Sequence, residues 1–464
     1  MPNSTHKITN HLVNKKNIYL TILLLILLIS PYFLRYLDNN QTIIGESSYF
    51  YLHSAENIDQ NNFYLNPYSL LLATNFTQSH WIYFLFPLIL AMLSLLLLSK
   101  VLDRTKLTKK HKFFFLLFLV SSPAFIYMFT VLNHYSFFIF IASLSFFLLL
   151  QKNKIWNYLS LPLFALITFF DIFSSILTIL LWLIYFKKEK TSHLSPYRKK
   201  APILILIIFT FFNILIGKPL MLGPYHLQGT LNIFSDLGCL FGISLFLFIL
   251  AVIGTTNTKN KLPFLAGYLL LPFFLVSFIY QTTTLIYFNF LMVFFASLGW
   301  MYLLNKEWKL QIIKTSTLFL LLLGILFSTL TSLDGFSTLP PDNPTKESLI
   351  FLKENTNVKR VIFAHPQDSY LVEYFSQREA FSKYHDPDFR NKLQTTNQIL
   401  QSTYIQKTFP LLEKNDLYYL FLSKKTKESL STEQGLLFLF QNERFKRIYN
   451  QNEIEIWKFE KKWG

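Results

Sequence analysis

The feature that most constrains this chain is a series of apolar runs, each near the length that a helix needs to cross a lipid bilayer. A helix spans about 30 Å of hydrocarbon with roughly 20 residues. Only 15% of the 464 residues are charged, against about a quarter in an ordinary soluble domain, and 51 residues are Phe. This composition excludes a disordered chain, a coiled coil and an ordinary cytosolic enzyme. The clearest runs are Ile18–Leu34, Trp81–Leu98, Phe113–Leu132, Ser136–Leu150, Pro202–Ile216, Leu237–Ile253, Leu262–Tyr280, Leu285–Leu304 and Ile312–Thr331.

A further apolar run, Tyr158–Phe186, is long for one span and short for two. Lysines precede it at positions 152 and 154, and lysines follow it at positions 187, 188 and 190. Because cytoplasmic loops carry an excess of Lys and Arg, both ends of the run are expected inside. The run then forms a hairpin of two short helices with Asp171 near the outer turn. The expected total is about eleven transmembrane helices.

The basic residues support one orientation of these helices. Of the 24 Lys and Arg residues before Leu333, 22 lie in segments that the topology places inside, and only Arg35 and Lys218 lie outside. The net charge of +17 therefore reflects membrane orientation and not binding to nucleic acid. We expect a multi-pass protein of the plasma membrane, with its N-terminus in the cytoplasm and its C-terminal part outside the cell.

From Leu333 onward the composition changes, and Pro340 and Pro341 mark a linker. We expect a membrane domain over 1–332, with a first outer loop over 35–80, and an extracytoplasmic α/β domain over 333–464. The apolar spacing predicts four helices and four strands in this second domain. The helices are expected at Thr345–Asn355, Ser369–Phe375, Asp388–Leu412 and Lys427–Phe440, and the strands at Arg360–Ala364, Leu417–Leu422, Phe445–Tyr449 and Glu453–Phe459.

Polar residues beside the bilayer cost free energy and are functional candidates. The first outer loop is richest in them. If its segment Gly45–Ile58 is helical, Glu46, Tyr49, His53 and Glu56 share one face, because residues three and four apart are neighbours on a helix. That face carries two carboxylates, a phenol and an imidazole. The alternative is an amphipathic helix that lies solvated on the membrane surface.

The same loop, an acid followed by Ser-Tyr-Phe-Tyr-Leu-His-Ser-Ala-Glu-Asn-Ile, resembles the first-loop motif of the GT-C membrane glycosyltransferases, in particular their archaeal members. The likeness to oligosaccharyltransferase catalytic subunits is distant, because their Trp-Trp-Asp-Tyr-Gly motif is missing. Several later stretches resemble the same family in the same order. They are Ser122–Tyr127, Asn133–Ser136, Phe234–Gly238, Glu347–Thr356 and Tyr374–Arg378.

The resemblance implies a GT-C-like membrane domain that moves a sugar from a polyprenyl- or dolichyl-phosphate carrier in the membrane. The acceptor is a glycan, a lipid or a protein on the outer face. An acceptor hydroxyl is a poor nucleophile, so a positioned carboxylate must take its proton, and Glu46 matches the acidic position of the motif. The departing lipid phosphate needs a cation, either Lys or Arg or a divalent metal ion, and Lys218 and Arg35 are the basic residues of the expected outer segments before Leu333.

The other candidate residues each have a structural alternative. Tyr49, His53 and Glu56 are expected to bind substrate together with Glu46. Four further residues are candidates for substrate binding: His134, Lys218, His226 and Asp236. The alternatives are an interfacial histidine for His134, a snorkelling lysine for Lys218 and a helix cap for Asp236. Asp171 is the second acid candidate, and it too suits a helix cap. Arg378 is expected to be a structural ion-pair partner in the outer domain.

Two other functions stay open. The second outer loop offers only Asn133-His134 where relatives carry a second acidic motif, which favours an inactive GT-C-like scaffold whose outer domain binds a partner. A transporter or flippase for a lipid-linked solute is the other alternative. Transporters usually show internal repeats with interrupted helices in matching halves, and the sequence shows no such halves.

Overall fold

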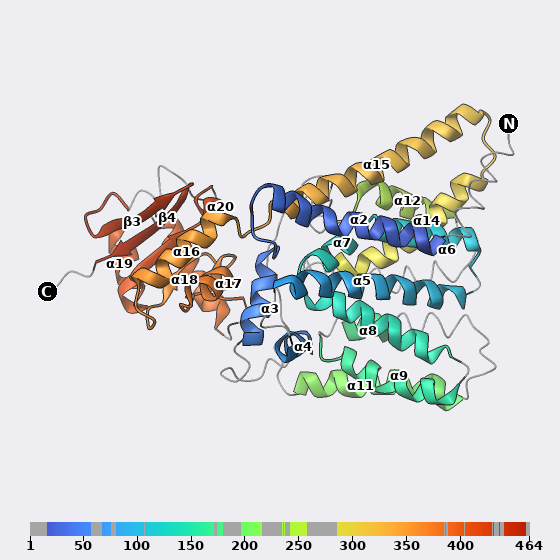
Figure 1. Cartoon of the computed structure of the whole chain (residues 1–464), viewed down its shortest axis with the longest axis horizontal. Coiled ribbons are helices and arrows are strands. Elements are labelled where there is room, and N and C mark those ends of the chain that lie inside the picture. The colour runs from blue at the N-terminus through green and yellow to red at the C-terminus, as the bar shows by residue number, and fades with distance from the viewer. Residues whose placement is uncertain are drawn as a thin grey trace. The chain divides into compact units, whose positions relative to one another are not determined.

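The computed structural model describes residues 16–56, 67–75, 80–105, 107–151, 153–170, 174–179, 196–215, 234, 236, 242–257, 285–384, 386, 388–402, 404–428, 430, 436 and 440–460. The chain divides into two compact units (Figure 1). Unit 1 comprises Met1–Leu34 and Asn62–Ser337, and unit 2 comprises Arg35–Asn61 and Thr338–Gly464. Most of the first outer loop therefore folds with the C-terminal residues.

Unit 1 is helical throughout its described part. Its helices are α2 (Lys16–Leu37, whose last residues enter unit 2), α4 (Pro67–Asn75), α5 (His80–Asp103), α6 (Lys109–Val120), α7 (Pro123–Thr130), α8 (His134–Leu149), α9 (Lys154–Ile167), α11 (Pro196–Leu215), α12 (Leu245–Asn257), α14 (Leu285–Asn305) and α15 (Gln311–Ser337). Among the described residues, α2, α5, α14 and α15 are long and apolar enough to cross a membrane.

The expected eleven spans are not confirmed. A fifth span is formed if α6 and α7 count as one, and the other apolar helices of the described part are shorter. The run Phe113–Leu132, expected as one helix, bends by 58° between α6 and α7. Pro123 begins α7, and the residue before a proline is driven out of the helical region, as the extended backbone of Ser122 shows. The expected span at Leu262–Tyr280 lies outside the described residues.

The long run Tyr158–Phe186 is interrupted near its middle. Helix α9 ends at Ile167, turn residues follow, and helical backbone resumes at Ser174. This break coincides with the turn that the hairpin prediction requires. Asp171 and residues 180–186 lie outside the described residues, so the hairpin stays a prediction.

Helices α12 and α14 approach each other with almost no space between their backbones. A Cβ atom at Gly254 would collide with the carbonyl oxygen of Phe295, and one at Gly299 would collide with the carbonyl oxygen of Leu250. Small residues at such crossings let membrane helices pack closely, since lipid supplies no hydrophobic force between helices. The two glycines thus allow this contact.

Buried polar groups of unit 1 form hydrogen bonds between helices. His111 Nε2 lies 2.7 Å from Ser297 Oγ, and Asn289 Nδ2 donates to Ser122 Oγ at 2.8 Å. Apolar side chains such as Phe319 of α15 and Ile22 of α2 are exposed instead. Exposed apolar surface and an interior whose described polar side chains are mostly Ser, Thr and Asn suit a protein whose solvent is lipid.

Unit 2 contains a four-stranded sheet in the order β1-β2-β4-β3. Its strands are β1 (Ile362–Phe363), β2 (Tyr419–Leu422), β3 (Phe445–Gln451) and β4 (Ile454–Phe459). β1 and β2 are parallel, and the other pairs are antiparallel. All four strands were predicted from the sequence, including the closing hairpin of β3 and β4, because each contains β-branched or aromatic residues.

Helices α16 (Asn343–Asn355), α18 (Phe389–Gln401) and α19 (Ile405–Lys414) surround this sheet in Figure 1. α16 contacts β3 and β4, while side chains of α18 and α19 share a hydrophobic core with β2, β3 and β4. The short helix α17 (Ser369–Leu371) continues as a π-helix, η4 (Val372–Ser376), where the sequence predicted one helix. Helix α20 (Lys424–Glu428) starts the predicted helix Lys427–Phe440, most of which lies outside the described residues.

The prediction of one helix over Asp388–Leu412 is wrong, because the segment forms α18 and α19 with a break near Ser402. The reason lies in the phase of the buried residues. Leu400 and Phe409 both enter the core, yet nine residues make roughly two and a half helical turns. In one continuous helix these side chains would point in opposite directions, and the break lets both face the sheet.

Candidate functional site

Helix α3 (Glu46–Glu56) carries the residues that the sequence singled out, and it lies in unit 2. Gly45 precedes it with a φ of 81°, a conformation that glycine adopts without strain. The Gly45 N–H donates to the carbonyl of Pro340 at 2.8 Å. The start of α3 is therefore fixed to the proline segment, which is a structural partner of the first loop and not a free linker.

Arg35 strengthens the same junction. Its side chain is buried and donates to the backbone carbonyls of Gln41, Leu339 and Pro341. A guanidinium has five N–H donors, and here several of them bind carbonyls of two chain segments far apart in sequence. The expectation that Arg35 serves as a cation for lipid phosphate is therefore replaced by a structural role.

Glu46 is the first residue of α3, where the helix dipole favours a negative charge. A second unit 2 side chain, Tyr384, lies within its electrostatic reach. Burial raises the pKa of the Tyr384 phenol, and the carboxylates of Glu46 and Asp368 raise it further. Tyr384 is therefore protonated at neutral pH, and a phenol hydrogen and two carboxylates are neighbours at this end of α3.

Asp368 precedes α17 and is held by two hydroxyls. Ser423 Oγ donates to its Oδ2 at 2.7 Å, and Thr426 Oγ1 donates to the same oxygen at 3.1 Å. Both partners lie beyond the end of β2. These bonds fix the position of the Asp368 carboxylate near Tyr384.

Tyr49, one turn after Glu46, is buried among aromatic rings. Its ring centroid lies 5.0 Å from those of Tyr374 and Phe375 on η4. Such tilted and edge-on pairs contribute about 0.5–1.5 kcal/mol each beyond the burial of their surface. Burial raises the pKa of the Tyr49 phenol well above its usual value. Tyr49 therefore attaches α3 to η4 and is not exposed to bind a substrate.

His53, one turn further, faces a buried charged pair. Its Nε2 lies 3.6 Å from Glu373 Oε2, while Glu373 Oε1 lies 2.6 Å from Lys383 Nζ. The Glu373 side chain is only 5% exposed, and Oε1 also accepts the backbone N–H of Ala380 at 3.3 Å. One buried carboxylate thus connects α3 to η4 and to the segment that carries Lys383.

The protonation states in this group follow from burial and from neighbouring charges. Burial lowers the pKa of His53, Glu373 raises it in part, and Lys383 lowers it again, so the imidazole is neutral at pH 7. Burial alone would lower the pKa of Lys383, but the contact with Glu373 and the charges of Glu379 and Asp386 raise it overall. The stable arrangement is a Glu373–Lys383 ion pair beside a neutral histidine.

The four residues that share the polar face of α3 thus enter different environments. Glu46 lies near Tyr384, Tyr49 is packed in aromatic rings, and His53 is beside Glu373. Glu56, at the end of the helix, is exposed. The face does not lie solvated along its length, because two of its side chains attach α3 to the rest of unit 2.

The stretch Tyr374–Arg378 belongs to the segment that contacts α3. A π-helix often marks a functional segment, and η4 brings Glu373, Tyr374 and Phe375 to α3 before Gln377 ends it in the left-handed region. Arg378 is buried and donates to the carbonyls of Lys353 and Thr356 at 2.6 Å each. It therefore caps the end of α16, where an ion-pair partner was expected.

Sequence reasoning missed Glu373, Lys383, Tyr384 and Asp368. One signal was available: Glu373 is a single acid within the apolar stretch Tyr370–Phe375, and such an acid must be paired if the stretch is buried. Its partner Lys383 follows ten residues later in a segment without a helical pattern. No spacing rule connects those two positions.

The remaining predicted residues lie elsewhere. His134 begins α8 in unit 1, and its ring stacks on Phe170 with centroids 6.4 Å apart. Asp236, also in unit 1, accepts the N–H of Leu245 at 2.6 Å and so caps α12, while its buried Oδ1 has no hydrogen-bond partner among the described residues. Asp171, Lys218 and His226 lie outside the described residues.

Within the described part of the chain, no three His, Cys, Asp or Glu side chains are grouped so that they could hold a metal ion. The acids near Tyr384 are Glu46 and Asp368, and Asp368 already accepts two hydroxyl hydrogens. The described site thus places the Glu46 carboxylate near a protonated phenol, that of Tyr384.

Comparisons with known proteins bear on the fold. No protein-family model matches the sequence, and no curated protein matches it either. Solved structures of an oligosaccharyltransferase from Archaeoglobus fulgidus do match. Its apo form superposes with a TM-score of 0.59 over 88% of this chain and 70% of that chain, at 11% sequence identity.

Two liganded forms of that enzyme match as well. The archaeal oligosaccharyltransferase AglB in complex with an inhibitory peptide and a dolichol-phosphate gives a TM-score of 0.60, 11% identity, and coverage of 96% of this chain and 75% of that one. The form tethered to an acceptor peptide with the NVT sequon gives a TM-score of 0.57 and 11% identity, and the match covers 96% of this chain and 74% of that one. The chain therefore shares the GT-C-like fold of these membrane proteins.

Proposed function

We propose that this protein is a membrane glycosyltransferase that moves a sugar from a polyprenyl- or dolichyl-phosphate carrier to an acceptor glycan, lipid or protein on the outer face. Glu46 is the general base of this reaction. The observation that carries the proposal is the packing of α3 against η4. Two separate contacts attach this helix to η4, in a chain whose fold is that of an oligosaccharyltransferase.

The fold supports the substrate class. One structure of that archaeal enzyme holds an inhibitory peptide and a dolichol-phosphate, and another is tethered to an acceptor peptide, so the same fold has precedents for a lipid phosphate and for an acceptor. Four apolar helices in the described part of unit 1 are long enough to cross a membrane, and a polyprenyl chain would lie in that membrane.

The proposed chemistry starts at Glu46. Its carboxylate accepts the proton of the acceptor hydroxyl while the oxygen of that hydroxyl attacks the anomeric carbon of the sugar. The bond between that carbon and the phosphate oxygen breaks, and the phosphate keeps the electron pair. Tyr384 stays protonated throughout, because burial and the two carboxylates raise its pKa. Its O–H is available to orient Glu46 or the acceptor.

The support under α3 serves this step by limiting its motion. General-base catalysis requires the carboxylate within hydrogen-bond distance of the proton that it takes. The aromatic contacts of Tyr49 and the contact of His53 with Glu373 hold one side of α3. Arg35 binds the carbonyl of Gln41, in the segment that leads into α3. A displacement of about 1 Å at a reacting group costs on the order of 100-fold in rate.

The departing phosphate requires a positive charge near it. Arg35 already binds carbonyls, so Lys218 becomes the leading basic residue of the expected outer segments, and a bound divalent cation is the other source. His134, His226 and Asp236 are proposed to contact the substrate, and the unpartnered Oδ1 of Asp236 supports its place in this group.

The direct test supplies purified protein in lipid nanodiscs with a radiolabelled polyprenyl-phosphate sugar and a mixture of peptide and glycan acceptors. The proposal predicts that label leaves the lipid and enters an acceptor in a time-dependent manner. If no polyprenyl- or dolichyl-phosphate sugar is consumed with any acceptor, in the presence or absence of divalent cations, the chain is a GT-C-like scaffold instead.

The orientation is tested separately with fused reporters. A reporter after Lys188 is expected to read cytoplasmic, and one after Gly464 is expected to read external, as the 22 basic residues of the expected inner segments require. Reporters that read the same side at both positions would refute the hairpin at Tyr158–Phe186 and the outer location of Asp171.

A further inference from the structure

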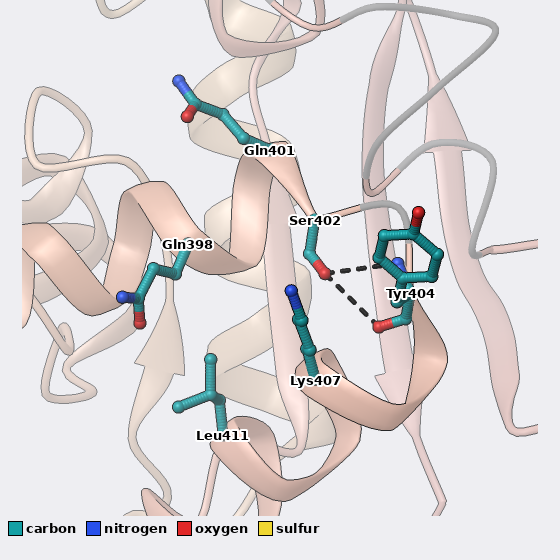
Figure 2. Close-up of a pocket in the computed structure, with 6 residues that line it drawn as sticks. All are labelled: Gln398, Gln401, Ser402, Tyr404, Lys407 and Leu411. Atoms are coloured by element: carbon teal, nitrogen blue, oxygen red, sulfur yellow. Dashed lines mark hydrogen bonds between the residues drawn. The ribbon is translucent and has the colours of Figure 1, made fainter.

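The surface of unit 2 contains a cavity of about 530 Å³ between α18 and α19 (Figure 2). This volume lies within the range of about 300–1,000 Å³ that is typical of ligand pockets. It involves neither α3 nor any residue near Glu46. Its lining side chains are Gln398, Gln401, Ser402, Tyr404, Lys407 and Leu411.

The walls of the cavity are anchored from behind. On α18, Ile399 and Leu400 are buried in the core of unit 2, so the glutamines on either side of them face outward. On α19, Phe409 and Leu412 enter the same core. Because each helix is held on its far side, the two walls form a fixed gap and not a transient one.

The lining is rich in groups that both donate and accept hydrogen bonds. An amide side chain offers two N–H donors and a carbonyl acceptor, and a hydroxyl offers one donor with acceptor lone pairs. Gln398 and Gln401 lie three residues apart on α18, which places them on one helix face. Ser402 Oγ contacts the backbone of Tyr404, with 3.3 Å to its O and 3.4 Å to its N.

Tyr404 supplies an aromatic ring with most of its surface in solvent. The residue is 63% exposed, and Leu411 supplies a partly buried aliphatic patch in the same cavity. An exposed ring costs free energy in water and offers flat contact area with little conformational entropy to lose. A ligand that has an apolar face and a polar edge would use both parts of this lining.

The lining residues include one positively charged side chain, Lys407, and no carboxylate. Lys407 Nζ lies 5.4 Å from the centre of the Tyr404 ring, and Figure 2 shows its side chain extending from α19 toward Ser402. One ammonium among amides does not make a phosphate site, which usually combines several N–H donors or an Arg fork.

We propose that this cavity binds a saccharide that carries a carboxylate, as in a uronic acid. Sugar hydroxyls are paired donors and acceptors that match the Gln398 and Gln401 amides, and the C–H face of a pyranose ring matches the Tyr404 ring. The sugar carboxylate lies against the Lys407 ammonium. The proposal concerns binding alone and holds whether or not the chain transfers sugar.

The test uses the full chain in nanodiscs, free of glucoside and maltoside detergents that would themselves occupy a sugar site. Saturation-transfer NMR is recorded with two soluble probes, a glucuronyl–glucose disaccharide and its neutral glucose–glucose counterpart. No lipid donor is present, so failure of this experiment is independent of sugar transfer by Glu46. The acidic probe is expected to receive saturation and to bind more tightly than the neutral one.

Four variants locate the binding. Tyr404→Ala is expected to abolish saturation transfer, and Gln401→Leu to weaken binding roughly fivefold, the equivalent of one hydrogen bond. Lys407→Gln is expected to equalise the two probes. Gln394→Ala, an exposed glutamine of α18 outside the lining, is the matched control and should bind as the wild type does.

Three results would overturn the proposal. One is the absence of binding to either probe at about 10 mM, a concentration that detects even weak sites. Another is binding that survives Tyr404→Ala, which places the sugar elsewhere on the chain. The third is binding of a peptide at Tyr404 when neither sugar binds there. Because Tyr404, Gln401 and Lys407 are exposed, their variants are expected to fold, and unchanged melting temperatures verify this.

Discussion

The two units of this protein differ in how many charged side chains they bury. In unit 1, the buried polar side chains of the described residues are mostly Ser, Thr and Asn, and Lys112 of α6 is the one Lys, Arg, Asp or Glu among them. In unit 2, fully charged side chains are buried: Arg35, Glu373 and Arg378 are each no more than 6% exposed. A charge inside a bilayer is costly, whereas outside it a buried charge can be retained if it is paired or bound to carbonyls.

The difference shows where the chain depends on charge. In unit 2 the buried charges connect segments distant in sequence: Arg35 reaches the 339–341 segment, and Glu373 reaches α3. Removing one partner of such a contact leaves the other unpaired in a poorly solvated place. In unit 1 the tight backbone contact at Gly254 and Gly299 has the corresponding importance. Charge changes should therefore harm unit 2, and volume changes should harm unit 1.

The largest stability effect is expected for Glu373→Gln. Lys383 would lose its buried carboxylate partner at 2.6 Å, at a cost of about 3 kcal/mol, the lower end of the range for a broken buried pair because Lys383 is partly exposed. Hydrogen exchange followed by mass spectrometry should show faster exchange in the amides of Glu46–Glu56.

The matched control for that variant is Glu379→Gln. Glu379 also lies near Lys383, at 3.7 Å, but is 59% exposed, and exposed pairs contribute about 0–1 kcal/mol. Equal effects of the two substitutions on α3 exchange would mean that burial of Glu373 has no special role, and the contrast between the units would lose its basis.

A somewhat smaller effect is expected for Gly299→Ala in unit 1. The added methyl group has no space beside the Leu250 carbonyl, so α12 and α14 must separate, at a cost of about 1–3 kcal/mol. The melting temperature of the protein in nanodiscs should fall. Leu326→Ala, on the exposed side of α15, is the control and should change the melting temperature little.

The pH dependence of unit 2 should involve His53. Burial and Lys383 lower the pKa of its imidazole in the folded chain, with partial opposition from Glu373, so the unfolded chain binds a proton more readily than the folded one. Stability from this group is complete above the unfolded pKa of about 6.5 and declines as the pH falls below it. The wild type should therefore lose more melting temperature between pH 7 and pH 5 than His53→Gln does. An identical loss in both would show that His53 does not contribute.

The smallest effect is expected for Asn289→Leu in unit 1. Asn289 Oδ1 is buried without a hydrogen-bond partner among the described residues, and Ser122 Oγ keeps its own bond to the Leu119 carbonyl when Asn289 is removed. Replacing a half-satisfied polar group by an apolar one of similar size is close to neutral, within about 1 kcal/mol. A large drop in melting temperature would contradict the view that unit 1 has no strict need for this polar contact.

Sequence patterns predicted the elements better than their connections. The hairpin of β3 and β4 follows from the strand-like runs at Phe445–Tyr449 and Glu453–Phe459, and α16 follows from helical spacing. The break between α18 and α19 was missed, because only the shared core shows that Leu400 and Phe409 must face the same way. The bend at Pro123 was missed because an apolar run of span length suggested one straight helix.

The candidate site was predicted in part for a similar reason. Gly45, Glu46 and His53 lie within one short stretch, so local spacing brings them to notice. The groups that surround α3, namely Asp368, Glu373 and Tyr384, are more than 300 residues away in sequence, and nothing local indicates that they meet it. Arg35 and Arg378 were taken for charged partners of anions, whereas both bind backbone carbonyls, a choice that only the folded chain displays.

The most direct test of the central claim compares sugar transfer by the wild type, Glu46→Gln and Glu56→Gln in the same nanodisc assay. Glutamine keeps the shape of Glu46 and removes its basicity, so transfer should fall about 10²–10⁴-fold, the usual contribution of a positioned base, with unchanged insertion and melting temperature. Glu56, exposed at the far end of α3 and roughly 15 Å away at 1.5 Å per residue, is the control and should retain most activity. Full transfer by Glu46→Gln would contradict the assignment and move the base to another acid.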